Sequence, residues 1–464
     1  MADLHPTSDS SGLYFPQDFT LLGLELLCAD GKVIELKEIM TEFSFYEDIY
    51  SPTISGYVRV ADSRGFSEIL PITGNEYLTL KFIKSKSDSI DPTLGTKIKF
   101  RVYKVDDRVP LPNMTSEEYS IYFCSEELLL SEQYKICKSY SAEKISTIIE
   151  DILTNKLNIP SDRIFVEETK GQYDFVIPNL KPFEAINWLS NYAQSKNNYG
   201  SDMLFYQSTN NFIFASLQTL FDADPQTTYR YQAKNLDHKI QDFENKALTI
   251  LQYEYMKTPD VLNEIRSGAF ANRLISINPL IRKHFVTDFS YDKYRNKLGG
   301  TSLLENGIAS NLKNRLGNIP TETYQAKLKV STSNFGYSSV DYIKDKPGSV
   351  ENNVDIETYV TSRTAQLSLI NYTRLKLEVP GDPFVQVGIT INVNILDLTP
   401  TGQGGPYERK LNDFYSGKYL ITAVRHIIEA KGRYRTILEV SKDSLKAKLP
   451  SFDNSNPNIM RGIK

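Results

Sequence analysis

Two runs of alternating apolar and polar residues predict an antiparallel sheet between Phe43 and Phe82. Apolar residues or glycine occupy every second position from Ile54 to Val60, and apolar residues do so again from Leu78 onward. Because strand side chains alternate between the two faces of a sheet, each run gives one buried and one solvated face. Turn formers separate the two runs, namely Asp62, Gly65, Pro71 and Gly74.

Similar patterns on either side extend this sheet. A hairpin turn is expected at Asp30 and Gly31, because Asp-Gly is a favoured two-residue turn between strands. Five or six short strands separated by turn residues predict a small antiparallel barrel or sandwich. The additional predicted strands are Phe19–Cys28, Lys32–Ile39, Lys97–Val105 and Tyr119–Ser125.

The hydrophobic pattern then changes to the helical period. Ser141 is predicted to cap a first helix that ends before Pro160, and Pro182 is predicted to begin a second helix. The apolar stripes are Ile145, Ile148, Ile149, Ile152 and Leu153 in the first helix, and Ile186, Leu189 and Ala193 in the second. Short strands are predicted at Tyr173–Ile177, Met203–Gln207 and Asn211–Ser216. Together these elements predict an α/β module.

Strand patterns return in the C-terminal part of the chain. Residues 237–290 have mixed strand patterns, whereas Tyr291–Val354 is rich in Asn, Gly and Ser and is predicted to be a polar insertion with a thin core. A short helix is predicted through Ile356–Val360. Val387 is predicted to face a core from a strand spanning Val385–Val393. The other predicted strands are Arg374–Val379, Gly417–His426 and Arg433–Val440.

The order of these segments resembles a known family over about Phe19 to Leu445. The chain resembles the opening barrel of the central baseplate hub protein of contractile-tailed bacteriophages in YED, SPTISGYVRVAD and ILPITGNEYLTL. It resembles that family's strand-to-helix segment and second helix in KICKSYSAEKISTIIEDIL and FVIPNLKPFEAINWLSNYAQ. It resembles the second barrel in VPGDPFVQVGITINV, FYSGKYLITAVRH and YRTILEVSKDS. The family is similar to the tail-tube protein and to the hub of the type VI secretion spike.

The resemblance implies an α+β fold with two small antiparallel tail-tube-like β-barrels, an inserted α/β module and a polar insertion. The expected division is a flexible arm at residues 1–17, a first barrel at 18–130, the α/β module at 131–236, a second barrel at 237–290 and 365–445, the insertion at 291–364, and a C-terminal tail at 446–464. The tail is basic, and either docks the spike or another baseplate protein or is a disordered end.

The resemblance also implies a structural function. Three copies would form a pseudo-sixfold ring that adapts the hexameric tail tube to the trimeric central spike and lets DNA pass. The expected partners are the other two copies, the spike protein, a tail tube or tube-initiator protein, the tape measure protein and other baseplate proteins, with DNA only in transit and no membrane insertion. The expected location is the tail baseplate of the virion, assembled in the bacterial host cytoplasm. Two alternatives stay open: the hub of a phage-like contractile injection system that delivers effectors, and a tail-associated cell-wall hydrolase.

The composition gives no overall attraction to nucleic acid or membrane. The 464-residue chain has 53 Lys and Arg against 57 Asp and Glu, a net charge of -4, so any DNA contact would depend on a local patch. Cys28, Cys124 and Cys137 match no zinc spacing and are expected to be buried in a reducing compartment. The N-terminus lacks a secretory pattern, and the longest apolar run is too short to span a bilayer.

No catalytic, cofactor-binding or metal-ligating set is predicted, and the chain is not expected to be an enzyme. Neighbouring carboxylates in strands point to opposite faces and do not converge on a substrate; the pairs are Asp106 and Asp107, Glu117 and Glu118, and Glu126 and Glu127. The histidines are scattered at His5, His238, His284 and His426, and the last is expected to be packed or hydrogen-bonded. The glycines of Gly402–Gly405 precede a strand pattern rather than a helix, which indicates a hairpin tip and not a phosphate loop.

Two basic groups leave three interpretations open. They are Lys97, Lys99 and Arg101 with Tyr103, and Arg433 and Arg435 with Tyr434. Each could contact DNA, could be the exposed face of an edge strand, or could form ion pairs in a lumen or between subunits. The 29 Tyr and 23 Phe residues either favour protein interfaces or reflect a β-rich fold.

Overall fold

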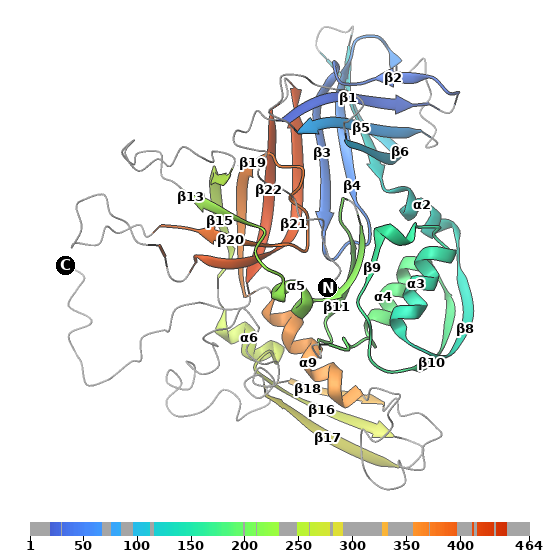
Figure 1. The fold of residues 1–464 in the computed structure, drawn as a ribbon, viewed down its shortest axis with the longest axis vertical. Coiled ribbons are helices and arrows are strands. Elements are labelled where there is room, and N and C mark those ends of the chain that lie inside the picture. Colours follow the sequence, from blue (N-terminus) through green and yellow to red (C-terminus); the bar gives the residue numbers. More distant parts are fainter. Residues whose placement is uncertain are drawn as a thin grey trace, which may run out of the picture.

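The fold is mostly β, with few helices, and the α+β class predicted from the sequence is confirmed (Figure 1). The computed structural model describes residues 19–28, 30–66, 76–84, 96–111, 116–197, 200–209, 211–231, 248–258, 260–278, 282–290, 327–332, 356–370, 372–396, 411–412, 415–430 and 433–442. The predicted arm at 1–17, the tail at 446–464, the glycines of Gly402–Gly405, His5, His238 and most of the predicted insertion lie outside these residues.

The first β unit contains the strands predicted in the N-terminal part and one more, β3, which was not predicted. They are β1 (Phe19–Leu27), β2 (Val33–Glu35), β3 (Met40–Asp48), β4 (Ser55–Asp62), β5 (Tyr77–Lys84), β6 (Thr96–Pro110) and β7 (Glu117–Cys124). They pair in the order β3-β4-β7-β6-β5-β1-β2, and each pair is antiparallel. One core fills this unit, with Phe43, Val58, Leu80 and Phe123 at or near zero exposure. Gly31, at φ +84°, makes the expected turn between β1 and β2.

The α/β module follows, with a core of its own. Its elements are α2 (Glu126–Gln133), β8 (Ile136–Glu143), α3 (Ile145–Asn155), β9 (Ile164–Val166), β10 (Tyr173–Leu180), α4 (Pro182–Ser190), β11 (Met203–Gln207), β12 (Phe212–Ser216) and α5 (Leu217–Asp222). The predicted apolar stripe of α3 is fully buried, and Pro182 is the first residue of α4 as expected.

Three local predictions in this region are wrong. Ser141 is not a helix cap; it lies in β8, donates its hydroxyl to Asp174, and Lys144 precedes α3 instead. Glu126 and Glu127 lie in the first turn of α2 rather than on a strand, where their charges suit the positive end of the helix. The exposed Cys137 departs from the prediction that all three cysteines are buried.

The second β unit is built from strands that flank the predicted insertion. They are β13 (Thr227–Tyr231), β14 (Thr249–Ile250), β15 (Gln252–Lys257), β19 (Thr373–Pro380), β20 (Thr390–Asn394), β21 (Gly417–Glu429) and β22 (Tyr434–Lys442). The pairing runs β14-β13-β20-β21-β22-β19-β15. Strands β14 and β15 are separated by Leu251 alone and form one nearly continuous segment. Its first part pairs with β13 and its last part with β19, and the backbone N–H of Leu251 donates to the backbone O of Glu378 on β19 (2.8 Å). The series of paired strands therefore begins and ends on this segment.

The predicted strand Val385–Val393 is only partly correct. All five of its alternating apolar residues are buried in the core of the second unit, including Val387 at 0% exposure. Regular pairing begins only at Thr390, because Gly388 adopts a left-handed backbone conformation (φ +81°) that interrupts a strand.

Strands β21 and β3 join the two units into one sheet. Seven residue pairs, from Ala423 opposite Asp48 to Glu429 opposite Glu42, form an antiparallel ladder. Among the described residues this produces one 14-stranded sheet, in which β21 pairs with β20, β22 and β3 (Figure 1). The local pattern of the sequence contains no sign of this pairing.

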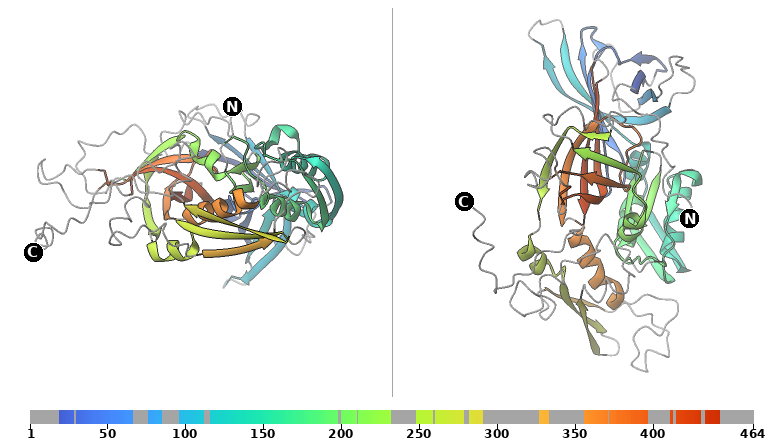
Figure 2. Two further views of the ribbon diagram at one scale, coloured as in Figure 1. Left: turned by 90° about the horizontal axis from the view of Figure 1, so that it is seen from below. Right: turned by 60° about the vertical axis from the view of Figure 1, so that its left-hand side comes forward.

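A smaller sheet lies at one end of the long axis of the molecule. It consists of β16 (Ala271–Asn278), β17 (Lys283–Ser290) and β18 (Lys327–Thr332), and is flanked by α6 (Val261–Ser267) and α9 (Ile356–Leu369) (Figures 1 and 2). Strands β16 and β17 fall within the range predicted for the second barrel but pair with each other, and β16 also pairs with β18 of the predicted insertion. Helix α9 is longer than the short helix expected there.

The hairpin of β11 and β12 connects the module to the first β unit. Gln207 accepts hydrogen bonds at Oε1 from the backbone N of Ile54 (3.1 Å) and from Oγ of Ser125 (2.6 Å). Thr209, in the turn of the hairpin, donates its hydroxyl to the carboxylate of Glu47 on β3. The hairpin therefore holds the position of the module against the sheet.

Glu47 connects the first β unit, the α/β module and the second β unit through buried hydrogen bonds. It lies on β3, is 1% exposed, and accepts hydrogen bonds from Thr209 of the module and from the backbone N of Val387 in the second unit (3.1 Å). Burial raises the pKa of Glu47 to about 7, and hydrogen bonds from Thr209 and Val387 counteract this only in part.

The raised pKa of Glu47 predicts a pH dependence of stability. Folding favours the protonated carboxyl, so the stabilisation is complete below pH 4.5 and is lost as the pH rises through about 7. Relative to Glu47→Gln, the free energy of unfolding of the parent should fall by about 3 kcal/mol between pH 4.5 and pH 8. Urea unfolding of both proteins across this range measures the difference. A difference that does not change with pH would contradict a titrating Glu47.

Candidate partner-binding face

One face of the large sheet extends across both β units. Core residues occupy alternate positions of the strands, so the positions between them share the opposite face. We call this the joined face. Its members are Glu42, Ser44 and Tyr46 of β3, Tyr57 and Arg59 of β4, Glu118 and Tyr122 of β7, Arg425 and Glu429 of β21, Arg435 and Glu439 of β22, Arg374, Lys376 and Glu378 of β19, and Glu254 of β15.

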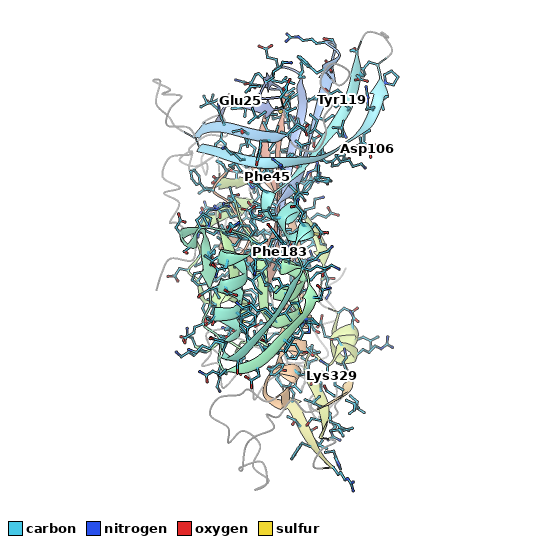
Figure 3. The ribbon with its side chains drawn as sticks, turned by 90° about the vertical axis from the view of Figure 1, so that its right-hand side faces the viewer. Glu25, Phe45, Asp106, Tyr119, Phe183 and Lys329 are labelled. Atoms are coloured by element: carbon cyan, nitrogen blue, oxygen red, sulfur yellow. The ribbon has the colours of Figure 1, made fainter. Side chains whose placement is uncertain are left out.

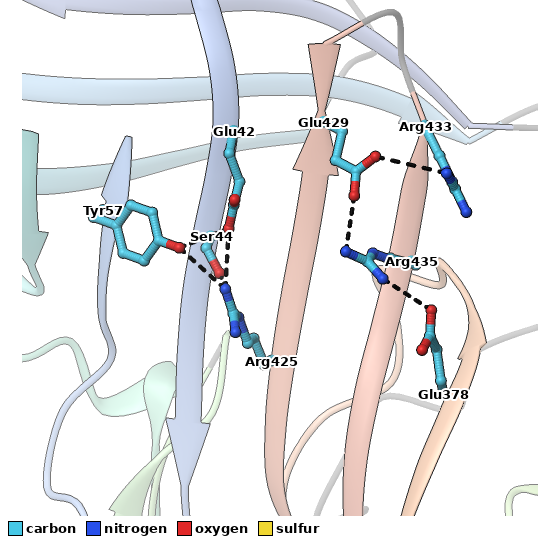
Figure 4. A network of polar contacts seen from close by, with 8 residues as sticks. All are labelled: Glu42, Ser44, Tyr57, Glu378, Arg425, Glu429, Arg433 and Arg435. Atoms are coloured by element: carbon cyan, nitrogen blue, oxygen red, sulfur yellow. Dashed lines mark hydrogen bonds and ion pairs between the residues drawn. The ribbon is translucent and has the colours of Figure 1, made fainter. Parts of the chain in front are cut away.

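Arg425 ties the joined face together where β21 meets β3. Its guanidinium donates to Oγ of Ser44 (2.9 Å), to Oε1 of Glu42 (3.0 Å) and to the hydroxyl of Tyr57 (3.0 Å) (Figure 4). The Tyr57 hydroxyl in turn donates to Glu42 (2.6 Å). Burial, followed by this bond to Glu42, raises the pKa of Tyr57 well above its ordinary value, so the hydroxyl keeps its proton. This side-chain network links the two units in addition to the backbone hydrogen bonds of the β21–β3 ladder.

A second network lies beside the first, on β19, β21 and β22. Arg435 pairs with Glu378 (3.1 Å) and with Glu429 (2.9 Å), and Arg433 lies 3.9 Å from Glu429 (Figure 4). The hydrogen bond to Glu378 contributes most to raising the pKa of Arg435. Across the rest of the face, Arg374 pairs with Glu439, Lys376 with Glu254 (3.8 Å), and Arg59 with Glu118 (3.7 Å). The cations of the joined face are thus matched by carboxylates.

Four tyrosines form a row across β3, β4, β7 and β6. Ring centroids are 6.4 Å apart from Tyr46 to Tyr57, 6.1 Å from Tyr57 to Tyr122, and 6.4 Å from Tyr122 to Tyr103. The row begins beside the join, with Arg425 5.3 Å from the Tyr46 ring. Tyrosine combines apolar area with a polar tip, which suits a protein contact surface.

The two basic groups considered in the sequence have different environments in the structure. Strand β6 pairs with β5 from Thr96 to Arg101 and with β7 from Arg101 to Pro110. Among the described residues Lys97 and Lys99 are therefore paired on one side only, as in an edge strand. Arg101 lies over the Tyr77 ring (4.2 Å), and Lys99 is exposed. Tyr434 is buried in the core and cannot form part of a surface platform, whereas Tyr103 is 48% exposed. Arg433 and Arg435 form ion pairs with carboxylates of the same chain.

The other residues considered in the sequence do not converge on one site. His426 is fully buried, its Nδ1 is 2.7 Å from the Tyr434 hydroxyl, and burial lowers its pKa to about 3, so it is a neutral packed residue as predicted. Glu126 accepts a hydrogen bond from Tyr77 (2.7 Å), and Glu127 lies 3.5 Å from Arg163.

The described residues include no group of three or more His, Cys, Asp or Glu side chains that could hold a metal ion. No helix among them is both long enough and apolar enough to cross a bilayer.

The sequence is similar to a known phage protein over most of its length. It is 25% identical over 411 residues to a probable baseplate hub protein of Vibrio phage KVP40, which covers 87% of this chain and 90% of that protein. The resemblance to phage baseplate hub proteins is confirmed. No protein-family model matches the chain.

The fold of this chain is also found in two tail proteins of known structure. A tail protein from Neisseria meningitidis MC58 aligns with a TM-score of 0.50 at 10% identity, covering 91% of this chain and 97% of that chain. The 43 kDa tail protein of prophage MuSo2 from Shewanella oneidensis aligns with a TM-score of 0.50 at 11% identity, covering 91% and 98%. At such low identity these alignments show a common fold and not a common activity.

Proposed function

We propose that this chain is a structural hub of a phage baseplate and that three copies form a pseudo-sixfold ring between a hexameric tail tube and a trimeric central spike. The observation that best supports this is the join between β21 and β3, which gives one chain two β units in one sheet with one shared face. Two units per chain, repeated by threefold symmetry, supply six positions around an axis.

We further propose that each β unit is a small barrel. In the second unit the pairings return to their starting strand, and in the first unit the strands surround one apolar core. The core of the first unit is made mainly of residues before 130, in keeping with the division predicted there. The core of the second unit also includes residues from Leu204 to Tyr229, so the cores do not follow the division predicted at residue 236.

The joined face is proposed to line the passage of the ring. DNA binding by proteins depends on cations that displace counterions from phosphates. On this face arginine is held by carboxylates of the same chain, so few cations are available for a passing phosphate. A neutral lining of this kind would let DNA pass without being held.

The remaining parts of the proposal concern assembly. The tail tube or a tube-initiator protein and the tape measure protein would meet the sixfold end, and the spike would meet the threefold end. Other baseplate proteins would surround the ring, and assembly would take place in the cytoplasm of the bacterial host before the virion is complete.

Mass photometry and negative-stain imaging of the chain, alone and mixed with its spike protein, test this proposal. The expected result is a threefold particle with six similar lobes around an opening. A chain that stays monomeric with the spike present, or a particle in which the β units lie at two different radii, would contradict it.

Removing the carboxylates that pair with Arg435 should create DNA binding. In the double variant Glu378→Gln, Glu429→Gln, the guanidinium of Arg435 and its neighbour Arg433 lose their partners. Affinity for duplex DNA should rise about tenfold at low salt and return to the parent value near 200 mM salt. Fluorescence anisotropy measures this. The control Glu143→Gln, Asp162→Asn removes the same charge from exposed positions outside the joined face; equal affinity of the two double variants would contradict the role of the pairs.

A further inference from the structure

The turn of the β11–β12 hairpin meets the end of β3 at a buried carboxyl group. Glu47 is the second-last residue of β3, whose C-terminal end points toward β11 (Figure 1). Along the long axis of the molecule, Phe45 of the same strand lies between Glu25 of the first β unit and Phe183 of the α/β module (Figure 3). Glu47 therefore lies where the large sheet meets the module.

The two carboxyl oxygens of Glu47 bind different regions of the chain. Oε1 accepts a hydrogen bond from the hydroxyl of Thr209, in the hairpin turn of the module, and Oε2 accepts one from the backbone N–H of Val387 in the second β unit (3.1 Å). Thr209 is half-buried, whereas Val387 is fully buried. Solvent therefore reaches the carboxyl group most directly from the side of the hairpin turn.

The groups that surround Glu47 on the buried side do not compensate a negative charge. The titratable side chains there are Tyr206 of β11, His426 of β21 and Tyr434 of β22, and all three are buried. Burial raises the pKa of the two tyrosines and lowers that of the histidine, so all three are neutral. Asp382, in the loop that carries Val387, would add only negative charge. Among the described residues no lysine or arginine pairs with Glu47.

Ionisation of Glu47 favours an arrangement in which the carboxylate reaches water, because a buried and unpaired charge is costly. Moving the hairpin turn away from β3 gives up the Thr209 contact and exposes the carboxylate. We propose that Glu47 is a proton-dependent latch: with its proton bound the hairpin turn is closed on β3, and loss of the proton to solvent releases the turn and loosens the module from the sheet. The latch assigns the opening to one contact and does not depend on the proposed ring.

A second contact of the same hairpin limits the opening. Oε1 of Gln207 accepts hydrogen bonds from the backbone N of Ile54 (3.1 Å) and from Oγ of Ser125 (2.6 Å). These groups carry no charge and do not titrate, so they hold the hairpin at any pH between the two states. The module therefore stays attached at Gln207, while the turn two residues further on is free to move when Glu47 is ionised.

Single-molecule energy transfer between dyes on the first β unit and on the module tests the latch. The dyes are attached at Val33→Cys of β2 and Val176→Cys of β10, which are 58% and 63% exposed, after the exposed Cys137 is replaced by serine. The ratio of open to closed molecules should be at least tenfold higher at pH 8 than at pH 5, and should level off above the pKa of closed Glu47, about 7. The matched control is Glu47→Gln, which has a similar shape and no proton to lose; its ratio should not change with pH.

Two outcomes overturn the latch: a parent protein with the same distribution of transfer efficiencies at pH 5 and pH 8, and a pH response that Glu47→Gln shares. A second variant decides the case in which Glu47→Gln fails to fold. Thr209→Val removes the hydroxyl donor on the module side, so its ratio of open to closed molecules at pH 5 should be about fivefold above that of the parent. A Thr209→Val protein that is as closed as the parent at pH 5 overturns the inference as well.

Discussion

Replacing Val387 with aspartate is expected to lower the free energy of unfolding by roughly 3–5 kcal/mol. Val387 is fully buried in the core of the second β unit, among aliphatic and aromatic side chains. Its backbone N–H already binds the carboxylate of Glu47, so a new carboxylate at this position would also lie near an existing acidic group. The substituted side chain would be both desolvated and close to a like charge.

Chemical unfolding at pH 8 measures the effect of Val387→Asp. The matched control is Val33→Asp, because Val33 is 58% exposed on β2 and its replacement removes the same atoms without burying the charge. The control should change the free energy of unfolding by less than about 0.5 kcal/mol. Equal midpoints for the two variants would contradict the position of Val387 in the core.

Gly388→Ala is expected to destabilise the protein by roughly 2–5 kcal/mol. The glycine has φ +81°, a conformation that costs other residues about 1 kcal/mol. A Cβ atom there would also lie 1.9 Å from the hydroxyl oxygen and 2.7 Å from Cζ of Tyr206. Tyr206 is fully buried and belongs to the hairpin that connects the α/β module to the sheet, so the clash cannot be relieved by a turn into solvent.

A double-mutant cycle separates the backbone strain at Gly388 from the clash with Tyr206. Tyr206→Phe removes the oxygen that the new methyl group would meet, and that oxygen has no hydrogen-bond partner among the described residues. We expect Tyr206→Phe to recover part of the stability lost in Gly388→Ala, with the remainder due to backbone strain and the ring carbon. The control Gly31→Ala has nearly the same φ (+84°) and no atom within 4 Å of the new Cβ, so it reports strain alone. Strictly additive effects of the two substitutions would contradict the contact.

The continuous sheet has a mechanical consequence for a hub. A flexible linker between two barrels would let each unit tilt independently, whereas a seven-pair ladder and the Arg425 network resist such tilting. The β11–β12 hairpin adds a further constraint through Gln207 and Thr209. In the proposed ring, such stiffness would keep the two units at equal radius while other parts of the tail rearrange.

The local pattern of the sequence correctly predicted features that depend on residues close together in the chain. Alternation located most strands, and the buried stripe of α3 and the start of α4 at Pro182 were correct. The burial of Val387 was also correct, although the strand around it begins later. These features follow from the periods of helix and strand, which the order of residues displays directly.

The sequence by itself determined which side chains face a core, and the order of its segments was enough to show the resemblance to baseplate hub proteins. Only the tertiary structure decided which strands meet, because periodicity reports the face of a strand and not its partner. Arg425 and Ser44, hydrogen-bonded across the join, are 381 residues apart in the chain. The same limit applies to the small sheet, where Val286, Val330 and Ile275 alternate like core residues and only the position of α9 shows that they lie on the uncovered side.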